Sequence, residues 1–222
     1  MQRIVAITAI MLLAIAPIAG AKDMPSMGKL GVGVNGGLML PASGDVTSDS
    51  SFSDFFKAGP QFGAHVNYTP IKELTLRTGF SYAFMKMKDE VRGSGTEEPY
   101  FTAPYAYVDA VLNLGGLIKS EKSIVNPYIA AGDGMYFWKI TDDGASGDAQ
   151  KLGNNEEFKK TSLGVHFGPG VEIFATPELS IFAEGKYHLI LAKDTDKFGE
   201  DFKNMSAIEV AAGLTYHFPL GK

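Results

Sequence analysis

The segment from Met205 to Phe218 constrains the fold more than any other part of the chain, because its side chains alternate between two kinds. One parity holds Ile208, Val210, Ala212, Leu214, Tyr216 and Phe218, and the other holds Glu209, Ala211, Gly213, Thr215 and His217. A period of two places these sets on opposite faces of a β-strand. An apolar face that ends in two aromatic rings is typical of a strand whose outer face contacts lipid.

The first 21 residues have the pattern of a secretory signal peptide. Arg3 supplies positive charge, residues 4–18 form an apolar run, and Ala19-Gly20-Ala21 is a small-x-small cleavage site. We therefore expect residues 1–21 to be removed on export and residues 22–222 to form one domain. A retained membrane anchor is the alternative, although the apolar run is short for that role.

Seven further segments alternate in the same way as the last one. The predicted strands are 30–40, 61–68, 74–85, 105–114, 127–140, 161–173, 179–189 and 205–218. Long polar loops and short turns alternate between them, apart from an intermediate connection at 115–125. Short periplasmic turns and long outer loops are typical of bacterial membrane barrels. We predict an all-β fold, an eight-stranded antiparallel up-and-down transmembrane β-barrel.

Composition argues against several other classes of protein. The chain has a formal charge of −5 and no basic patch, which gives no support for nucleic-acid binding. It has no cysteine and therefore no disulfide framework. Beyond the leader no run of 18 apolar residues occurs, so no transmembrane helix is predicted. Its 26 glycines, 15 phenylalanines and 9 tyrosines lie in short alternating runs that indicate strands.

Several charged residues of the predicted strands have the parity opposite to their apolar neighbours, and we expect six of them to form a polar network: Arg77, Asp109, Glu172, Glu184, Lys186 and Glu209. A charge is costly in lipid, so we expect these side chains to face the lumen. An eight-stranded barrel is just wide enough to be filled by side chains, so buried charges must pair. We predict the pairs Lys186–Glu209 and Arg77–Glu172 within a polar plug. A narrow ion path gated by such a pair is the alternative.

The 127–140 strand has the least regular pattern, because two apolar residues share the parity of Asp133. Placing Asp133 in the lumen puts Tyr128, Tyr136 and Trp138 on lipid. Outward aromatic side chains then gather near both ends of the strands, as the girdles of a membrane barrel do. A soluble lipocalin-like barrel, with the apolar faces around an internal ligand cavity, is the alternative fold, but it gives no reason for aromatic clusters at strand ends.

The sequence carries no recognisable catalytic, cofactor or metal motif. Gly31-x-Gly33-x-x-Gly36 matches a dinucleotide-binding pattern superficially, but it lies within a predicted strand and no helix follows it. The four histidines all have the inward parity and no two lie at a ligand-like spacing: His65, His166, His188 and His217. We expect no cofactor, no metal site and no enzymatic activity.

The chain end resembles a known targeting signal. Gly213-x-x-Tyr216-x-Phe218 is similar to the C-terminal signal of bacterial outer-membrane proteins, although residues 219–222 follow it here. With the leader, the eight strands and Asn126-Pro127-Tyr128, the mature chain resembles the outer-membrane β-barrel family of OmpA and OmpX type. This resemblance implies outer-membrane location, delivery to the barrel-assembly machinery and a monomeric barrel with a solid polar interior. The peptidoglycan-binding domain of OmpA-type proteins is absent from the sequence, so wall anchoring is not expected.

A filled barrel of this kind is a scaffold in the outer-membrane lipid, and its long outer loops carry any specificity. The first of these loops, about 42–59, contains Phe52, Phe55 and Phe56, which we predict to contact an extracellular ligand. The leading hypothesis is a structural or surface-interaction role such as adhesion, matrix contact or envelope stabilisation. The alternative is a narrow gated channel for ions or small molecules, lined by the charged residues of the lumen. An enzyme acting on outer-leaflet lipid is a third and weaker hypothesis.

Overall fold

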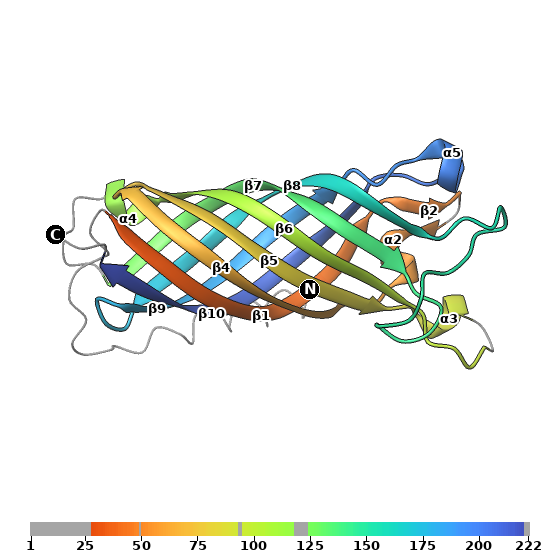
Figure 1. Ribbon diagram of the computed structural model, residues 1–222, viewed down its shortest axis with the longest axis horizontal. Coiled ribbons are helices and arrows are strands. Elements are labelled where there is room, and N and C mark those ends of the chain that lie inside the picture. Colours follow the sequence, from red (N-terminus) through yellow and green to blue (C-terminus); the bar gives the residue numbers. More distant parts are fainter. Residues whose placement is uncertain (1–27, 49, 93–94, 118–123, 220–222) are drawn as a thin grey trace, which may run out of the picture.

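The computed structural model describes residues 28–48, 50–92, 95–117 and 124–219, and these form one closed barrel (Figure 1). The barrel strands are β1 (Lys29–Ser43), β4 (Gly59–Ile71), β5 (Leu74–Lys86), β6 (Tyr100–Asn113), β7 (Val125–Ile140), β8 (Lys159–Phe174), β9 (Leu179–Ile190) and β10 (Met205–Pro219). The expected signal peptide at 1–21 lies outside the described residues, and so do residues 220–222 that follow the aromatic chain end.

Each barrel strand pairs antiparallel with its neighbour in the sequence, and β1 closes the barrel against β10. This is the predicted up-and-down topology, and all eight predicted strands are confirmed. The largest boundary difference is in β6, which begins at Tyr100 instead of residue 105. The extra residues include Pro104 and do not alternate, so the sequence pattern does not reveal them as strand.

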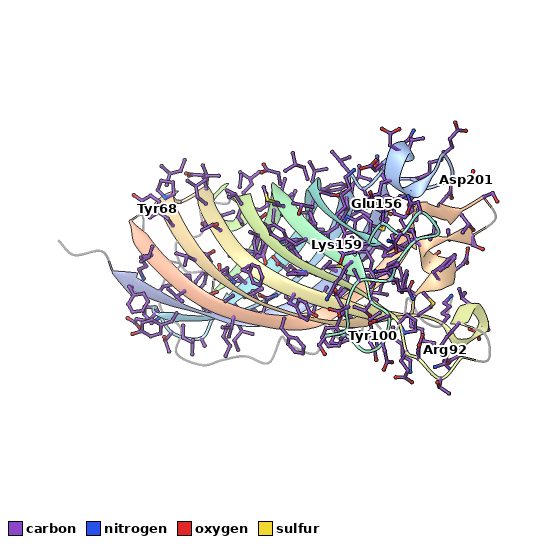
Figure 2. The ribbon with its side chains drawn as sticks, turned by 45° about the vertical axis from the view of Figure 1, so that its right-hand side comes forward. Tyr68, Arg92, Tyr100, Glu156, Lys159 and Asp201 are labelled. Atoms are coloured by element: carbon purple, nitrogen blue, oxygen red, sulfur yellow. The ribbon has the colours of Figure 1, made fainter. Side chains whose placement is uncertain are left out.

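The connections divide the barrel into two different ends. One end, here called the loop end, carries β2 (Asp45–Thr47), β3 (Ser50–Ser51), α2 (Phe52–Phe55), α3 (Asp89–Arg92) and α5 (Thr195–Phe198). The other, the turn end, carries α4 (Leu114–Leu117) and the short connections after β4 and β8. Figure 2 places Tyr68 at the turn end and Arg92 and Asp201 at the loop end. Within the described ranges, no helix has the length and hydropathy needed to cross a membrane.

Side chains sort by strand parity in the sense expected of a barrel in lipid. Outward positions are apolar and exposed, as the exposed fractions of Val34 (59%), Phe62 (56%) and Leu163 (63%) show. Inward positions carry buried polar and charged side chains, among them Gln61 and Asp109, each at 0% exposure. Soluble proteins bury apolar side chains and expose polar ones. The opposite arrangement here fits a surrounding membrane and contradicts the soluble lipocalin-like alternative.

β7 has the opposite phase to the predicted one. Asp133 is exposed on the outer surface, whereas Tyr128, Tyr136 and Trp138 point into the lumen with at most 2% exposure. The prediction was wrong because it gave priority to keeping one carboxylate out of lipid. In the structure the three rings gain partners for their polar atoms inside the lumen, including a bond from Trp138 Nε1 to Ser162 Oγ at 3.0 Å.

Outward aromatic side chains still lie towards both ends of the barrel. Those towards the turn end are Tyr68, Tyr216 and Phe218, and those towards the loop end are Tyr82, Phe84 and Tyr187. Aromatic rings at these two levels suit the two membrane–water interfaces. The girdles are therefore present, without the three rings that β7 turns inward.

Candidate functional site

The candidate site is the barrel interior, where all six predicted charged residues point. Each stands on the inward parity of its strand: Arg77 on β5, Asp109 on β6, Glu172 on β8, Glu184 and Lys186 on β9, and Glu209 on β10. All are buried except Glu172, which is half-buried. They form three layers, here called the turn layer, the middle layer and the loop layer.

The turn layer is built around Glu172. Its Oε1 accepts a hydrogen bond from Ser180 Oγ at 2.6 Å and lies 3.3 Å from His217 Nε2. Ser180 Oγ and His217 Nε2 are 2.9 Å apart, so the three side chains contact one another. In a catalytic triad the carboxylate binds the imidazole nitrogen that faces away from the serine. Here both groups meet the same nitrogen, so the set links β8, β9 and β10 and does not activate the serine.

The middle layer is a network of four charges. Arg77 Nη1 donates to Glu184 Oε2 at 2.7 Å, and Lys186 Nζ lies 3.1 Å from Glu184 Oε1 and 3.0 Å from Asp109 Oδ2. β5 and β9 are on opposite sides of the barrel, so the Arg77–Glu184 pair spans the lumen. Asp109 also contacts His166. Two cations face two carboxylates, which is the balance that burial of charge requires.

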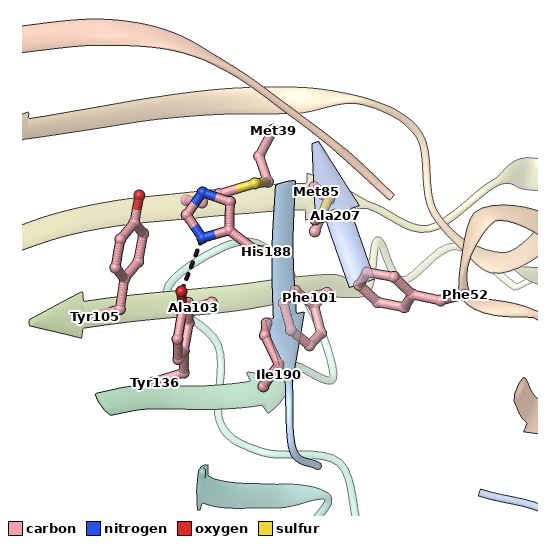
Figure 3. A pocket seen from close by; sticks show the side chains of 11 residues that line it. Met39, Phe52, Met85, Phe101, Ala103, Tyr105, Tyr136, His188, Ile190 and Ala207 are labelled. Atoms are coloured by element: carbon pink, nitrogen blue, oxygen red, sulfur yellow. Dashed lines mark hydrogen bonds between the residues drawn. The ribbon is translucent and has the colours of Figure 1, made fainter. Parts of the chain in front are cut away.

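The loop layer is built around Glu209 and combines one carboxylate with aromatic rings. Glu209 Oε2 accepts a hydrogen bond from the Tyr105 hydroxyl at 2.8 Å and lies 2.9 Å from His188 Nε2. The Tyr136 hydroxyl lies 2.8 Å from His188 Nδ1, the bond drawn in Figure 3. The rings of Tyr105 and Tyr136 stack with their centres 5.0 Å apart. Rings therefore fill the width of the lumen while their polar atoms satisfy the carboxylate.

The predicted Lys186–Glu209 pair does not form. The two residues are opposite each other in the β9–β10 ladder, as the sequence suggested. Lys186 instead extends to Asp109 and Glu184, and Glu209 is satisfied within the loop layer. The prediction was wrong because two carboxylates from different strands offer the ammonium group more contacts than one neighbour does.

The predicted Arg77–Glu172 pair is also wrong. Arg77 does reach across the lumen, but its partner is Glu184, and Glu172 binds His217 in the layer below. Parity along a strand tells which residues enter the lumen. The height at which they meet depends on strand tilt and on the stagger of the hydrogen-bond register, which no single strand reveals.

Three tyrosines of the lumen were not predicted: Tyr105, Tyr128 and Tyr136. The Tyr128 hydroxyl donates to Glu184 Oε2 at 2.9 Å, so this side chain belongs to the middle layer. The feature of the sequence that could have indicated an inward position is the tyrosine hydroxyl, which needs a polar partner. A tyrosine that finds a polar partner is well suited to a lumen that already contains carboxylates.

The lumen is closed at the loop end by an apolar cluster, here called the cap. Its main members are Met39, Phe52, Phe56, Met85, Phe101, Trp138 and Phe202. Trp138 stacks on Phe101 and on Phe202, with ring centres 5.9 and 5.8 Å apart. Phe52 meets Phe101 edge-on at 4.8 Å. The cap therefore joins the first outer loop to β6, β7 and the segment before β10.

A small cavity remains between the cap and the loop layer. Figure 3 shows Met39, Met85, Phe101 and Ile190 around it, with His188 at its polar side. Its volume is about 10 Å³, which is room for no more than one water-sized molecule. The space between the loop layer and the cap therefore admits no larger solute.

The structure places the loop phenylalanines differently from the ligand-contact hypothesis. Phe52 and Phe56 are each 1% exposed because they are part of the cap, and Phe55 is half-buried. α2 holds them there and is itself capped: the Ser51 N–H and hydroxyl bind Asp54 Oδ2 at 3.0 and 2.7 Å. These two hydrogen bonds hold the pKa of the Asp54 carboxyl below its ordinary value. Phe52 and Phe56 therefore seal the barrel and are not available to a ligand, whereas contact of Phe55 with a ligand stays a prediction.

The predicted assembly signal lies at the turn end of β10. Tyr216 and Phe218 are exposed outward at 48% and 44%, and their ring centres are 4.8 Å apart. Gly213 lies on the inward parity, where a Cβ would approach the Phe182 ring to 2.6 Å. The two rings are therefore accessible on the barrel surface, whereas Gly213 makes room inside. Recognition by the assembly machinery stays a prediction.

The loop end presents an acidic surface. Carboxylates there that are exposed and form no ion pair with another described residue include Asp45, Glu90, Glu97, Asp142, Asp148, Asp196, Glu200 and Asp201. Several lysines are already neutralised, as in Lys57–Asp89 at 2.7 Å and Lys160–Asp194 at 3.2 Å. Loops also brace one another, because the Glu98 N–H donates to Asp143 Oδ1 at 2.7 Å.

The side chains of the interior connect strands to one another. In the described part of the chain, no group of three or more histidine, aspartate or glutamate side chains is arranged to hold a metal ion. The charged groups of the three layers contact each other across strands. Their arrangement ties opposite walls of the barrel together.

Comparison with known proteins agrees with this architecture. A family model described as the outer membrane protein β-barrel domain matches residues 5–218. Comparison with curated protein sequences gives no match. Similar solved structures include Neisserial surface protein A (20% identity, TM-score 0.54), a major outer membrane protein from Thermus thermophilus (14%, 0.53) and Ail, the attachment invasion locus protein of Yersinia pestis (11%, 0.52). Each alignment covers 86% of this chain and 99% of the other.

The structural similarity shows a shared fold, and the family model spans nearly the whole chain. The closed barrel, its apolar outer surface and its polar filled lumen are the features such a family requires. The chain therefore belongs to the outer membrane β-barrel family, whose members lie in the bacterial outer membrane.

Proposed function

We propose that this barrel is a membrane scaffold whose loop end has a structural or surface-interaction role outside the cell. The observation that carries the proposal is closure of the lumen. Every charged group of the middle layer has an ionic partner, and the cap covers the loop layer. A filled interior offers no path for a solute, so the surface open to partners is that of the loops.

The charge of the loop end indicates the kind of partner. Exposed carboxylates such as Glu90, Glu97 and Asp142 have no ion pair within the described ranges, whereas Lys57 and Lys86 are neutralised by Asp89 and Glu98. A surface of this sign attracts partners rich in lysine and arginine and raises their rate of encounter. The Ail structure holds a heparin analogue, a polyanion. An acidic loop end opposes such a ligand, so we do not extend it to this chain.

A binding role is favoured over catalysis by the position of the histidines. All four are inside the lumen and at most 4% exposed: His65, His166, His188 and His217. None of them faces the lipid or the loop-end surface. An enzyme acting on outer-leaflet lipid needs a proton-transfer group within reach of its substrate. The outer surface lacks histidine for that role.

Binding of a lysine-rich peptide to the protein in neutral lipid nanodiscs tests the proposal. We expect Glu90→Gln, Glu97→Gln, Asp142→Asn and Asp148→Asn together to weaken binding about tenfold, which corresponds to about 1.4 kcal/mol. The matched control is the triple variant Lys88→Gln, Lys151→Gln and Lys193→Gln, which should bind as well as wild type or better. Added salt should weaken wild-type binding, because exposed charges are screened.

Two outcomes contradict the proposal. One is equal binding by wild type and the carboxylate variant, provided that both migrate as the compact folded form on an unheated gel. The other is discrete conductance by the refolded wild type in a planar bilayer, altered by Lys186→Gln. That result favours the gated-channel alternative, since Lys186 lies between the two carboxylates of the middle layer.

A further inference from the structure

Asp133 is a charged side chain on the lipid-facing surface, away from the strand ends. It is exposed, and it lies in register between Val108 of β6 and Val165 of β8, whose side chains are 56% and 49% exposed on the same face. Among the described residues its carboxylate has no hydrogen bond and no ion pair. Ionisable residues in the membrane mark functional sites by default, and a partner should be named for each.

The position of Asp133 along β7 places it deep in the membrane. The outward apolar residues of β7 extend from Pro127 to Phe137. With a rise of about 3.3 Å per residue and a tilt of about 45°, Asp133 lies roughly 9 Å from the loop-end edge and roughly 14 Å from the other. Long lysine and arginine side chains can reach the headgroups from such depths, but an aspartate cannot. Its carboxylate is therefore held within the hydrocarbon.

Three small side chains lie near Asp133 on the outer surface of β6 and β7. Ala106, Ala110 and Ala131 occupy neighbouring outward positions on β6 and β7. Phe167 of β8 is in register with Ala131 and is 58% exposed. Small residues on a membrane-embedded surface allow two backbones to pack closely. The carboxylate lies at the centre of a surface suited to contact.

We infer that Asp133 is the centre of a lateral contact site, within the membrane, for a different protein that presents a lysine or arginine at the same depth. In a water-free surrounding such a cation meets the carboxylate in a strong ion pair. Charge complementarity selects this partner. A lipid amine stays at headgroup level and does not reach the carboxylate.

A second copy of this chain does not fit, because symmetric contact brings two carboxylates together. Within the described residues, the outward cations lie near strand ends and are engaged there. Lys86 and Lys159 pair with Glu98 and Glu157, and Lys139 donates to the Gly147 carbonyl. The described part of the chain therefore places no cation beside Asp133.

Site-directed photo-crosslinking in cells that naturally produce the protein tests this inference. Phe167 is 58% exposed and in register with Ala131, so its replacement by p-benzoylphenylalanine is conservative. We expect an adduct with one other outer-membrane protein, at least tenfold weaker with Asp133→Asn and retained with Asp133→Glu. The matched control is the same replacement of Phe62, which is 56% exposed on β4, directly opposite β8. It should give no adduct that depends on Asp133.

Capture alone does not support the inference; dependence on charge does. Asp133→Lys should abolish the adduct, and exchange of the partner's facing lysine or arginine for aspartate should restore it. An adduct of two copies of this chain, an adduct unchanged by Asp133→Asn, or no adduct at all overturns the inference. Asp133→Leu is the folding control. It should raise the denaturation midpoint of the isolated barrel in lipid, because it removes an unpaired carboxylate from the hydrocarbon.

Discussion

At the scale of single residues, the barrel depends on buried charges that need an oppositely charged partner. Arg77 is 5% exposed and Glu184 is 3% exposed, and burial of either charge is costly without an opposite charge beside it. The pair joins walls that are far apart around the barrel, β5 and β9. The apolar side chains of the outer surface face lipid and do not pack into a protein core. Interior contacts such as this pair are therefore a major source of stability.

Removal of Arg77 should expose this dependence. Arg77→Met leaves Glu184 with one cation in place of two, and we expect a loss of about 3–5 kcal/mol in the free energy of unfolding. This free energy is measured by denaturant titration of the refolded protein in lipid, with Trp138 fluorescence as the signal. Arg77→Met with Glu184→Gln should lose less than the sum of the single changes. Lys160→Met removes a loop-end ion pair and should leave the midpoint unchanged; an equal shift in both variants refutes the argument.

At the scale of elements, the alternation of side chains predicts which face of most strands points outward. It fails where two rules for placing side chains disagree. In β10 the large apolar residues from Ile208 to Phe218 share the outward face, and the structure agrees. In β7 the rule that charges avoid lipid opposes the rule that tyrosine and tryptophan seek polar partners. The glycines at 132 and 134 fit either phase and cannot decide. The phase depends on partners that other strands supply, such as Glu184 for Tyr128.

The cap was equally beyond sequence patterns, because its members meet only after folding. Phe52 from the first loop packs on Phe101 of β6, and Phe202 from the last loop packs on Trp138 of β7. Nothing in the loop around Phe52 distinguishes a ring that seals the lumen from one that awaits a ligand. Sequence reasoning found the lumen residues and the loop rings but could not determine their partners.

Phe52 and Phe55 provide a test of the cap within one helical turn. Phe52 is 1% exposed, whereas Phe55 is half-buried. We expect Phe52→Ala to open the cap and to increase quenching of Trp138, the single tryptophan, by acrylamide. Phe55→Ala should change quenching much less. If both variants leave Trp138 as protected as in wild type, the first loop does not seal the barrel.

At the scale of the whole molecule, stability depends on closure of the sheet along the β1–β10 seam. The seam runs from Lys29–Pro219 to Ser43–Ser206, so the first and last strands meet along their whole length. Closure removes every unpaired strand edge, which a membrane would not tolerate. Anything that holds β1 and β10 apart should therefore affect the whole barrel and not one layer of it.

Two adjacent glycines in β1 allow the effect of holding β1 and β10 apart to be distinguished from the general effect of adding a side chain. A Cβ at Gly37 would lie 2.1 Å from the Val210 carbonyl oxygen of β10, whereas at Gly36 the nearest atom, Phe62 Cδ1, is 3.5 Å away. We expect Gly37→Val to prevent closure, because a backbone atom must move, and Gly36→Val to fold normally with its side chain towards lipid. Migration on unheated gels after refolding distinguishes the compact barrel from the open chain. Compact migration of Gly37→Val contradicts the argument, because it shows that the seam can widen without loss of the fold.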